Sequence, residues 1–348
     1  MRHHGPRNER ELTITPAGRK IGIAYKKIEN SAEEIGDYMS NETFLGLDFG
    51  GTKLLIGEID SEGLVLRTKK YHSGYMEQDQ ALNFITQSLD DYFEKEKPKP
   101  AAMGLGVVGR VDNKQGIWFE MDGLRKGELP IAGMLSRRYG IPCFIDNDVR
   151  SAARAERRFG YGKRSQHFIY INIGTGIAAG TVSNGQILTG GHCNAGEVGH
   201  THSGINAGID CICGRKDCTE MLASGKGLDF CARLYAPRFP DTALKIPNDE
   251  KVSVPDIFFM ADTDELCKFL VNQAAETLAN LLMNMVRVSD PDTIVLGGGV
   301  VSDGILLPKI KEKLNPHTMR YVTNGVVLTE LKAEHIGLIG ACTVAMNL

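Results

Sequence analysis

The stretch FLGLDFGGTKLLIGEIDSEGLVL occupies residues 44–66, where two apolar runs flank the glycine-rich turn 48–53. A second turn follows at 60–63, so this stretch predicts a β-meander. A stretch of the same order, FIYINIGTGIAAGTVSNGQIL, begins at Phe168. Aligning the two matches Asp48 with Asn172, which predicts two lobes built on related strand frames.

The segments around these stretches add helices and further strands. Apolar periodicity predicts helices over 81–96, 149–159 and 264–288, and a strand over 293–296. Strands that alternate with helices indicate an α/β fold with mixed sheets. A length of 348 residues favours two lobes of comparable size over a single core.

The composition restricts the partners. A net charge of -3 and a pI near 6.3 offer no basic field for nucleic acid or an anionic membrane, so a small molecule is the expected partner. No run approaches the roughly 20 apolar residues of a membrane span, and the N-terminus lacks the apolar core of a signal peptide. We therefore expect a cytoplasmic protein. Five cysteines outside one cluster are expected to be buried and reduced: Cys143, Cys193, Cys231, Cys267 and Cys342.

Residues 1–41 are polar and lack a sustained apolar stripe, which predicts a loosely attached extension. Met39 directly precedes the first convincing strand, so translation from Met39 is a further hypothesis. A native mass that starts at Met1 would exclude it.

The turn at 48–53 suits phosphate. Glycines without side chains let backbone N–H groups approach phosphate oxygens, and a carboxylate at a strand end can hold hydrated Mg²⁺. The matching turn, 172–176, supplies a second such loop, as a nucleotide clamped between lobes requires. A plain hairpin turn remains the alternative for the first loop. The letters of a dinucleotide fingerprint at 104–109 lack the following helix, and no P-loop motif occurs.

Asp146-Asn147-Asp148 lies between an apolar run and a helical segment. A carboxylate at such a junction can accept the proton of an attacking sugar hydroxyl, which makes Asp148 a candidate base. Asn147 can hydrogen-bond sugar hydroxyls. The alternative is that these side chains only cap the helix.

A cluster of metal-binding residue types follows Glu197. His200, Cys211, Cys213 and Cys218 form a Cys₃His set, which is typical of a closed structural zinc site. Zinc would order a polar loop that carries Glu197 and Glu220. Free thiols beside an unrelated histidine are the alternative.

A third glycine-rich segment follows an apolar strand at Gly297, Gly298 and Gly299. It would let a flat nucleobase lie against the backbone. The alternative is a plain strand-to-helix turn without a ligand, in which glycine is common because of its backbone freedom.

Together these motifs resemble the ROK family of repressors, uncharacterised reading frames and sugar kinases, among the actin-like, hexokinase-type ATPases. The strongest markers are DFGGTK at Asp48, INIGTG at Ile171, E-x-G-H at Glu197, C-x-C-G-x-x-x-C-x-E at Cys211 and GLIGA at Gly337. The resemblance implies a two-lobed actin-like (ribonuclease H-like) α/β fold with an interlobe cleft and a small zinc-bound loop. We therefore expect three parts: the polar N-terminal extension 1–42, a small lobe 43–122 plus helix 336–348, and a large lobe 123–335 that carries the sugar site and the zinc loop.

The resemblance also implies ATP-dependent phosphorylation of a hexose hydroxyl, as in glucokinase, with Asp148 as the general base. A homodimer is the family-level expectation. ATP and Mg²⁺ would be held by Asp48, Gly50, Gly51, Thr52, Lys53, Gly174, Thr175, Gly176, Gly297, Gly298 and Gly299. The sugar would contact Asp122, Asn147, Glu197, His200 and Glu220, and structural zinc would be bound by His200, Cys211, Cys213 and Cys218.

Three positions depart from the family pattern. Asp122 stands where the family usually has an asparagine that contacts sugar. Arg110 stands where proline is common, and Arg150 where a small or neutral residue is usual. The arginines either recognise an acidic group on the substrate or cap helices and face solvent.

The motifs leave two other functions to consider. A sugar-responsive repressor needs an N-terminal helix-turn-helix, and residues 1–41 show neither paired amphipathic helices nor concentrated basic charge. A sugar-binding protein without catalysis is disfavoured because Asp48 and Asp148 are both present. Glucose, allose, fructose and N-acetylmannosamine remain open as substrates.

Overall fold

The computed structural model describes residues 42–74, 76–93, 99–120 and 127–346, which belong to one compact unit. Two predictions lie outside the described residues: the expected extension 1–42, apart from residue 42 itself, and the role of Asp122. No helix in these ranges is long and apolar enough to cross a bilayer.

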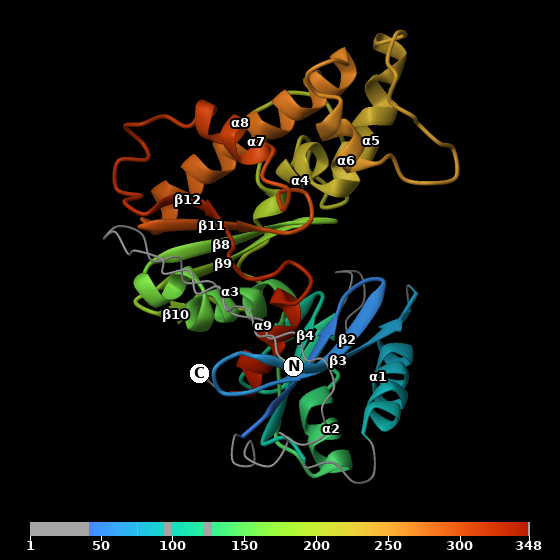
Figure 1. Ribbon diagram of the computed structural model, residues 1–348, viewed down its shortest axis with the longest axis vertical. Helices are drawn as coiled ribbons and strands as arrows, with labels where there is room; N and C mark the ends of the chain where they lie inside the picture. The colour runs from blue at the N-terminus through green and yellow to red at the C-terminus, as the bar shows by residue number, and fades with distance from the viewer. Residues whose placement is uncertain (1–41, 75, 94–98, 121–126, 347–348) are drawn as a thin grey trace, which may run out of the picture. The chain divides into compact units, whose positions relative to one another are not determined.

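The first sheet has the strand order β3-β2-β1-β4-β7. Its antiparallel part is the meander β1 (Phe44–Phe49), β2 (Lys53–Ile59) and β3 (Val65–His72). β4 (Ala102–Val107) and β7 (Cys143–Asn147) continue it in parallel with β1. The predicted meander is therefore confirmed, and it forms one half of a mixed sheet (Figure 1).

The second sheet repeats this order as β10-β9-β8-β11-β12. β8 and β9 form the antiparallel hairpin with β10 at its edge, and β11 and β12 run parallel to β8. The identical order and sense confirm the predicted duplication of the strand frame. The bounds are β8 Phe168–Ile173, β9 Ile177–Ser183, β10 Gln186–Ile187, β11 Thr293–Gly297 and β12 Gly325–Leu328.

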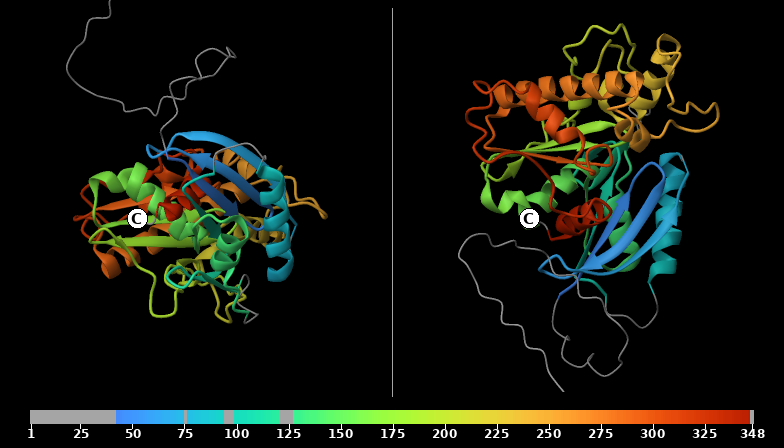
Figure 2. Two further views of the ribbon diagram at one scale, coloured as in Figure 1. Left: turned by 90° about the horizontal axis from the view of Figure 1, so that it is seen from below. Right: turned by 45° about the horizontal axis from the view of Figure 1, so that its top comes forward.

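Helices cover both sheets, which is why the central strands are apolar on both faces. In the first sheet, α1 (Gln78–Tyr92) and α2 (Ile131–Tyr139) share one buried cluster with β1 and β4. In the second, a larger cluster joins β8 and β11 to five helices, of which α7 is the longest (Figures 1 and 2). They are α4 Thr219–Ala223, α5 Gly225–Tyr235, α6 Val254–Phe259, α7 Glu265–Ser289 and α8 Leu306–Lys313.

Two helices link the sheets: α3 (Asp148–Phe159) contacts β8 and β9, and α9 (Ile336–Ala345) contacts β1 and β4. They also pack on each other so closely that a Cβ at Gly340 would lie 2.5 Å from the Ser151 carbonyl oxygen. A Cβ at Gly104 would likewise collide with the Ala341 carbonyl. Glycine is therefore required here for backbone-to-backbone packing.

Short elements complete the fold. β5 (Arg110–Asp112) and β6 (Ile117–Glu120) form a separate two-stranded sheet directly after β4. The element that directly follows β4 is β5 rather than a helix, so the dinucleotide-binding alternative is excluded. Turns of 3₁₀ helix lie at Tyr161–Arg164, Val198–His200 and Ala236–Arg238.

Several boundaries differ from expectation. The helix expected over 81–96 begins at Gln78 and ends at Tyr92, and β7 belongs to the first sheet although it lies within 123–335. The lobe division remains a prediction, and the sheet order favours a boundary after β7. Cys143 and Cys193 are only half-buried, against expectation, whereas Cys231, Cys267 and Cys342 are buried.

Candidate functional site

Asp148 is the first residue of α3, directly after β7. The helix cap is the preceding residue, because Asn147 Oδ1 accepts hydrogen bonds from the N–H groups of Val149 (3.0 Å) and Arg150 (3.2 Å). Asn147 Nδ2 donates to the Gly109 carbonyl at 3.0 Å. The alternative that these side chains cap the helix is therefore correct for Asn147. With one of its two amide hydrogens on the Gly109 carbonyl, its side chain has only one left to donate to a ligand.

The Asp148 carboxyl has an unusual acidity. Burial raises its pKa to about 7, and the neighbouring Asp48 carboxylate adds to the shift. An aspartate with an ordinary pKa of about 4 would be ionised at neutral pH. Asp148 in the unliganded protein departs from this because it is buried. A carboxyl that titrates near neutrality suits a general base, because a substantial fraction is deprotonated at that pH and the carboxylate is more basic than that of an ordinary aspartate.

Asp48 lies at the carboxyl end of β1, in register with Gly106 of β4, which in turn pairs with Asp146 of β7. Because β1, β4 and β7 are parallel, their ends meet at one edge of the sheet. A Cβ on Gly337, in the first turn of α9, would collide with the Asp48 carboxylate. Burial raises the Asp48 pKa, and the nearby Lys53 ammonium counteracts this.

The first glycine turn closes through a hydrogen bond from Gly50 N to Lys53 O of 3.0 Å. Gly51 and Thr52 are exposed, and a Cβ on Gly51 would meet no atom within 4 Å. Open backbone beside a buried carboxylate fits the expected phosphate site.

Hydrogen bonds to residues of α4 and α5 support the second glycine turn. Gly174 O accepts from Gly225 N at 2.8 Å, and Glu220 Oε2 accepts from Ile177 N at 2.9 Å. A Cβ on Gly176 would lie 2.5 Å from Glu220 Oε2. Glu220, expected to face sugar, therefore uses one oxygen to support the turn and keeps the other for a ligand.

A pocket of about 390 Å³ opens beside the second turn. Of the three consecutive glycines only Gly299 lines it; a Cβ at Gly297 would collide with Tyr170, and Gly298 has φ +94° and packs on Ile173. Sequence reasoning missed most of the lining, although the Ser224 cap that begins α5 signals its edge. The lining includes Thr175, Gly225, Lys226, Lys251, Val254, Pro255, Phe258, Val300 and Asp303.

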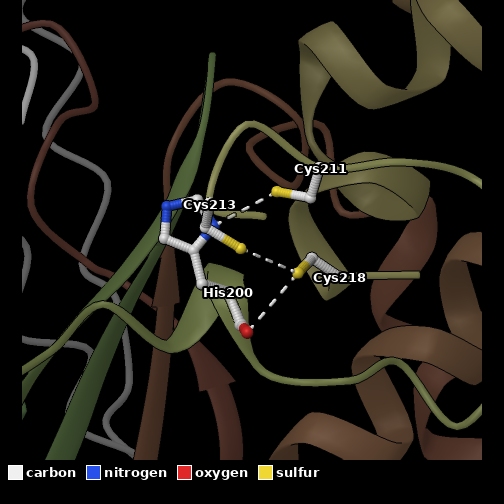
Figure 3. A group of neighbouring side chains, drawn as sticks. All are labelled: His200, Cys211, Cys213 and Cys218. Carbon is white, nitrogen blue, oxygen red and sulfur yellow. Dashed lines mark hydrogen bonds between the residues drawn. The ribbon is translucent and has the colours of Figure 1, made fainter. Parts of the chain in front are cut away.

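Four side chains converge in the loop after β10 (Figure 3). The donor atoms of His200, Cys211, Cys213 and Cys218 all lie within 4.8 Å of one another. Cys211 Sγ is 3.5 Å from His200 Nδ1, and Cys213 Sγ is 3.5 Å from Cys218 Sγ. A tetrahedral zinc with bonds of about 2.0–2.3 Å needs donor separations of about 3.5–3.8 Å, so the residues fit this metal.

The metal-binding set also lies next to two acidic residues. His200 ends the 3₁₀ turn whose cap is Glu197, and Cys218 is the cap of α4, which carries Glu220. Partial burial raises the Glu197 pKa; His200 opposes this shift, and the Glu220 charge adds to it. Glu197 in turn raises the pKa of Asp148. The structure thus brings four expected site residues close enough to interact electrostatically: Asp48, Asp148, Glu197 and Glu220.

Arg150 corrects an expectation. It neither faces solvent nor presents its charge to a ligand, because its side chain is 3% exposed and its Nε donates to Asp146 Oδ1 at 2.7 Å. Arg154 donates to the other oxygen of Asp146 at 3.0 Å. Asp146, which sequence reasoning left without a role, is therefore the fully buried centre of a charged cluster.

Comparisons with known proteins agree with this architecture. The ROK family model matches residues 44–347. The glucokinase of Halalkalibacterium halodurans is 27% identical over 296 residues, which cover 82% of this chain and 89% of that protein. A transcriptional dual regulator of Escherichia coli, NagC, is 26% identical over 262 residues, which cover 75% of this chain and 63% of that protein.

Among solved structures, the ROK family glucokinase of Streptomyces griseus, in complex with glucose and AMPPNP, superposes with a TM-score of 0.72 at 26% identity. The alignment covers 88% of this chain and all of that one. The predicted α/β fold of actin-like type is thereby confirmed. Because the family model spans nearly all the described residues, this chain belongs to the ROK family.

Proposed function

We propose that this protein transfers the γ-phosphoryl group of ATP to a hydroxyl group of a neutral hexose. The observation that carries the proposal is the pair of carboxyls at one sheet edge, Asp48 and Asp148, of which Asp148 has a pKa of about 7. The glucokinase relative with bound AMPPNP and glucose supports the same reaction class.

Asp148 acts as the general base. It accepts the proton of the attacking hydroxyl as the phosphoryl group arrives, so transfer of the proton accompanies transfer of the phosphoryl group. Its helix position and the hydrogen bond from Val149 N to its Oδ1 (2.9 Å) fix its orientation. Asn147 holds the turn that presents it.

Phosphate charge is neutralised by backbone. The exposed residues Gly51 and Thr52 of the first turn and Thr175 of the second offer backbone N–H groups to phosphate oxygens, and Thr175 lines the pocket. Lys226 and Lys251 add cationic charge at that pocket. Asp48 would hold Mg²⁺, which supplies positive charge for the phosphoryl oxygens when bound. Positioning and electrostatics, rather than covalent chemistry, then supply the rate enhancement.

Charge favours a neutral sugar. The acceptor side is surrounded by the carboxyls of Asp48, Asp148, Glu197 and Glu220, which would repel an acidic or phosphorylated sugar. Arg150 offers no hydrogen bond to an acidic substrate because its buried guanidinium is already bound to protein acceptors, and its charge stabilises the Glu197 carboxylate instead. Glucose, allose, fructose and N-acetylmannosamine all fit this restriction.

The test is ADP release by the purified full-length protein with Mg-ATP across aldoses, ketoses, N-acetylhexosamines and acidic sugars. We expect sugar-dependent release with at least one neutral sugar and none with acidic sugars, and loss of release in Asp148→Asn. Absence of sugar-dependent release across the whole panel would refute the kinase.

A sugar-responsive regulator is the second candidate, because NagC is among the relatives. A gel-shift assay with upstream DNA, with and without the panel sugars, distinguishes it. Sugar-sensitive DNA binding without ADP release would favour the regulator.

A further inference from the structure

The loop that leads to Glu197 has a strained tip. It runs from the end of β10 through 188–197, and its ends are fixed by hydrogen bonds from Ala195 N to Thr189 O (3.2 Å) and from Ala179 N to Gly196 O (2.8 Å). At the tip, Cys193 has φ +58°, a left-handed conformation that non-glycine residues rarely adopt. Such a conformation persists where surrounding contacts enforce it.

Those contacts come from arginines. Arg150 Nη1 donates to the Cys193 carbonyl at 3.1 Å, and Arg110 Nη1 donates to the adjacent His192 carbonyl at 3.4 Å. The two arginines reach the loop from different elements, since Arg110 begins β5 and Arg150 lies in the first turn of α3. Two consecutive carbonyls of the tip are thus bound to separate cations.

Arg150 is itself rigidly held. Its Nε binds Asp146 Oδ1 at 2.7 Å and its Nη2 donates to the Val111 carbonyl at 3.0 Å. With Nη1 bound to the Cys193 carbonyl, one buried guanidinium connects β7, β5 and the loop. Arg150 also lies in the same helix as Asp148, two residues further along the chain. The planar fork of arginine can satisfy three acceptors in fixed directions, which a lysine ammonium cannot do.

Arg110 supports the same arrangement from a more exposed position. Its guanidinium stacks over the Phe119 ring at 4.2 Å, which fixes the side chain beside the loop. The departures at 110 and 150 thus have one physical explanation: both hold the same loop.

We propose that Arg150, assisted by Arg110, is a positioning residue for the acceptor sugar, because it holds the tip of loop 188–197 and thereby fixes Glu197 relative to Asp148. The role deepens the proposed function, since it concerns the sugar side of that site. Without the arginine contacts, loop 188–197 relaxes away from its strained conformation and Glu197 loses its place. Binding of ATP, which is assigned to other elements, is unaffected.

Arg150→Lys tests this role because it keeps the charge beside Asp146 but cannot reach all three acceptors. We expect the amides of 190–196 to exchange with deuterium at least about tenfold faster in the unliganded protein, as loss of a charge-assisted hydrogen bond implies. We further expect the sugar KM to rise about tenfold, with kcat and the ATP KM changed less than about threefold.

Arg154→Lys is the matched control. Arg154 binds the other oxygen of Asp146 from the next turn of α3, so the variant perturbs the same carboxylate but leaves the bonds of Arg150 to the loop in place. Its exchange in 190–196 and its sugar KM are expected to match the wild type. An equal effect in both variants would overturn the proposal, because it would mean that only the charged cluster matters.

Arg110→Gln covers the case in which Arg150→Lys fails to fold. It leaves Asp146 untouched and removes the cation that faces the His192 carbonyl, so faster exchange confined to 190–196 is expected. Unchanged exchange in every folded variant overturns the proposal, as does a parallel loss of kcat, both KM values and thermal stability. The exchange measurement needs no turnover, so it decides the loop contact even if the panel of sugars shows no kinase activity.

Discussion

The two sheets share strand order and sense, yet their corresponding edges carry different chemistry. In the first sheet, Asp48, Gly106 and Asp146 lie in register across β1, β4 and β7. In the second, Asn172 of β8 pairs with Gly297 of β11, and a threonine, Thr329, directly follows β12. At these strand-end positions the first sheet carries two carboxyls and the second carries none, so we call them the acidic edge and the neutral edge.

This difference separates two tasks. The acidic edge can hold a cation and accept a proton, and it needs a bound cation before it can face a triphosphate. The neutral edge lies beside a glycine turn and a pocket, so under the proposed function a nucleotide there meets no carboxylate at the strand ends. The same strand frame thus presents different side chains at its two edges, and the proposed function assigns Mg²⁺ and the attacking hydroxyl to one edge and the nucleotide to the other.

Removing the base from the acidic edge should have the largest effect. Asp148→Asn keeps the size and the helix position of the side chain but cannot accept the hydroxyl proton, so we expect kcat to fall at least about 100-fold. Sugar binding, measured by calorimetry, should stay within about threefold of wild type. Near-normal turnover would show that this carboxyl is not the base.

Disrupting the cluster of His200, Cys211, Cys213 and Cys218 should have the next largest effect. Cys213→Ala removes one of four ligands, so we expect loss of bound zinc and a rise in the sugar KM of at least about tenfold, because Glu197 and Glu220 lose their support. Metal analysis and kinetics check this, with Cys143→Ala as the control outside the cluster. Zinc-free wild-type protein, purified without chelators, would contradict the zinc assignment.

Making the neutral edge acidic should have a smaller effect. Asn172→Asp introduces a carboxylate at the position that corresponds to Asp48, beside the turn assigned to phosphate. Repulsion of the triphosphate should raise the ATP KM about tenfold and leave the sugar KM unchanged. Asn172→Ser, which is neutral, is the control, and an equal effect in both variants would indicate a loss of packing instead.

The strand frame was predictable because its signals are local. Apolar runs, glycine turns and their repetition at 44–66 and 168–188 specify each meander without reference to the rest of the chain. The clustering of His200 with three cysteines was likewise visible, since ligand spacing is a property of one short segment.

The rest of the site depends on contacts between distant segments. The pairing of Arg150 with the Cys193 carbonyl joins residues 43 positions apart, and no local pattern indicates it. The pocket residues Lys226, Phe258 and Asp303 come from three separate elements. The pKa of Asp148 depends on its burial and on its proximity to Asp48, and no sequence motif specifies either of these.

The smallest expected effect concerns stability at the acidic edge. The pKa of Asp148 is about 7 in the folded protein and near its ordinary value of 3.8 when unfolded, so the folded state binds the proton more tightly. The ionised carboxyl therefore destabilises the fold progressively as pH rises from about 4 to about 7, and the loss is constant above pH 7. Asp148→Asn cannot ionise, so it does not show this loss of stability. Its melting temperature should exceed that of wild type by a few degrees at pH 8, and the difference should shrink steadily towards pH 5.5. Asn172→Ser, at the neutral edge, should show no such pH dependence. A pH-independent difference for Asp148→Asn would mean that burial and the neighbouring Asp48 do not raise the pKa of this carboxyl.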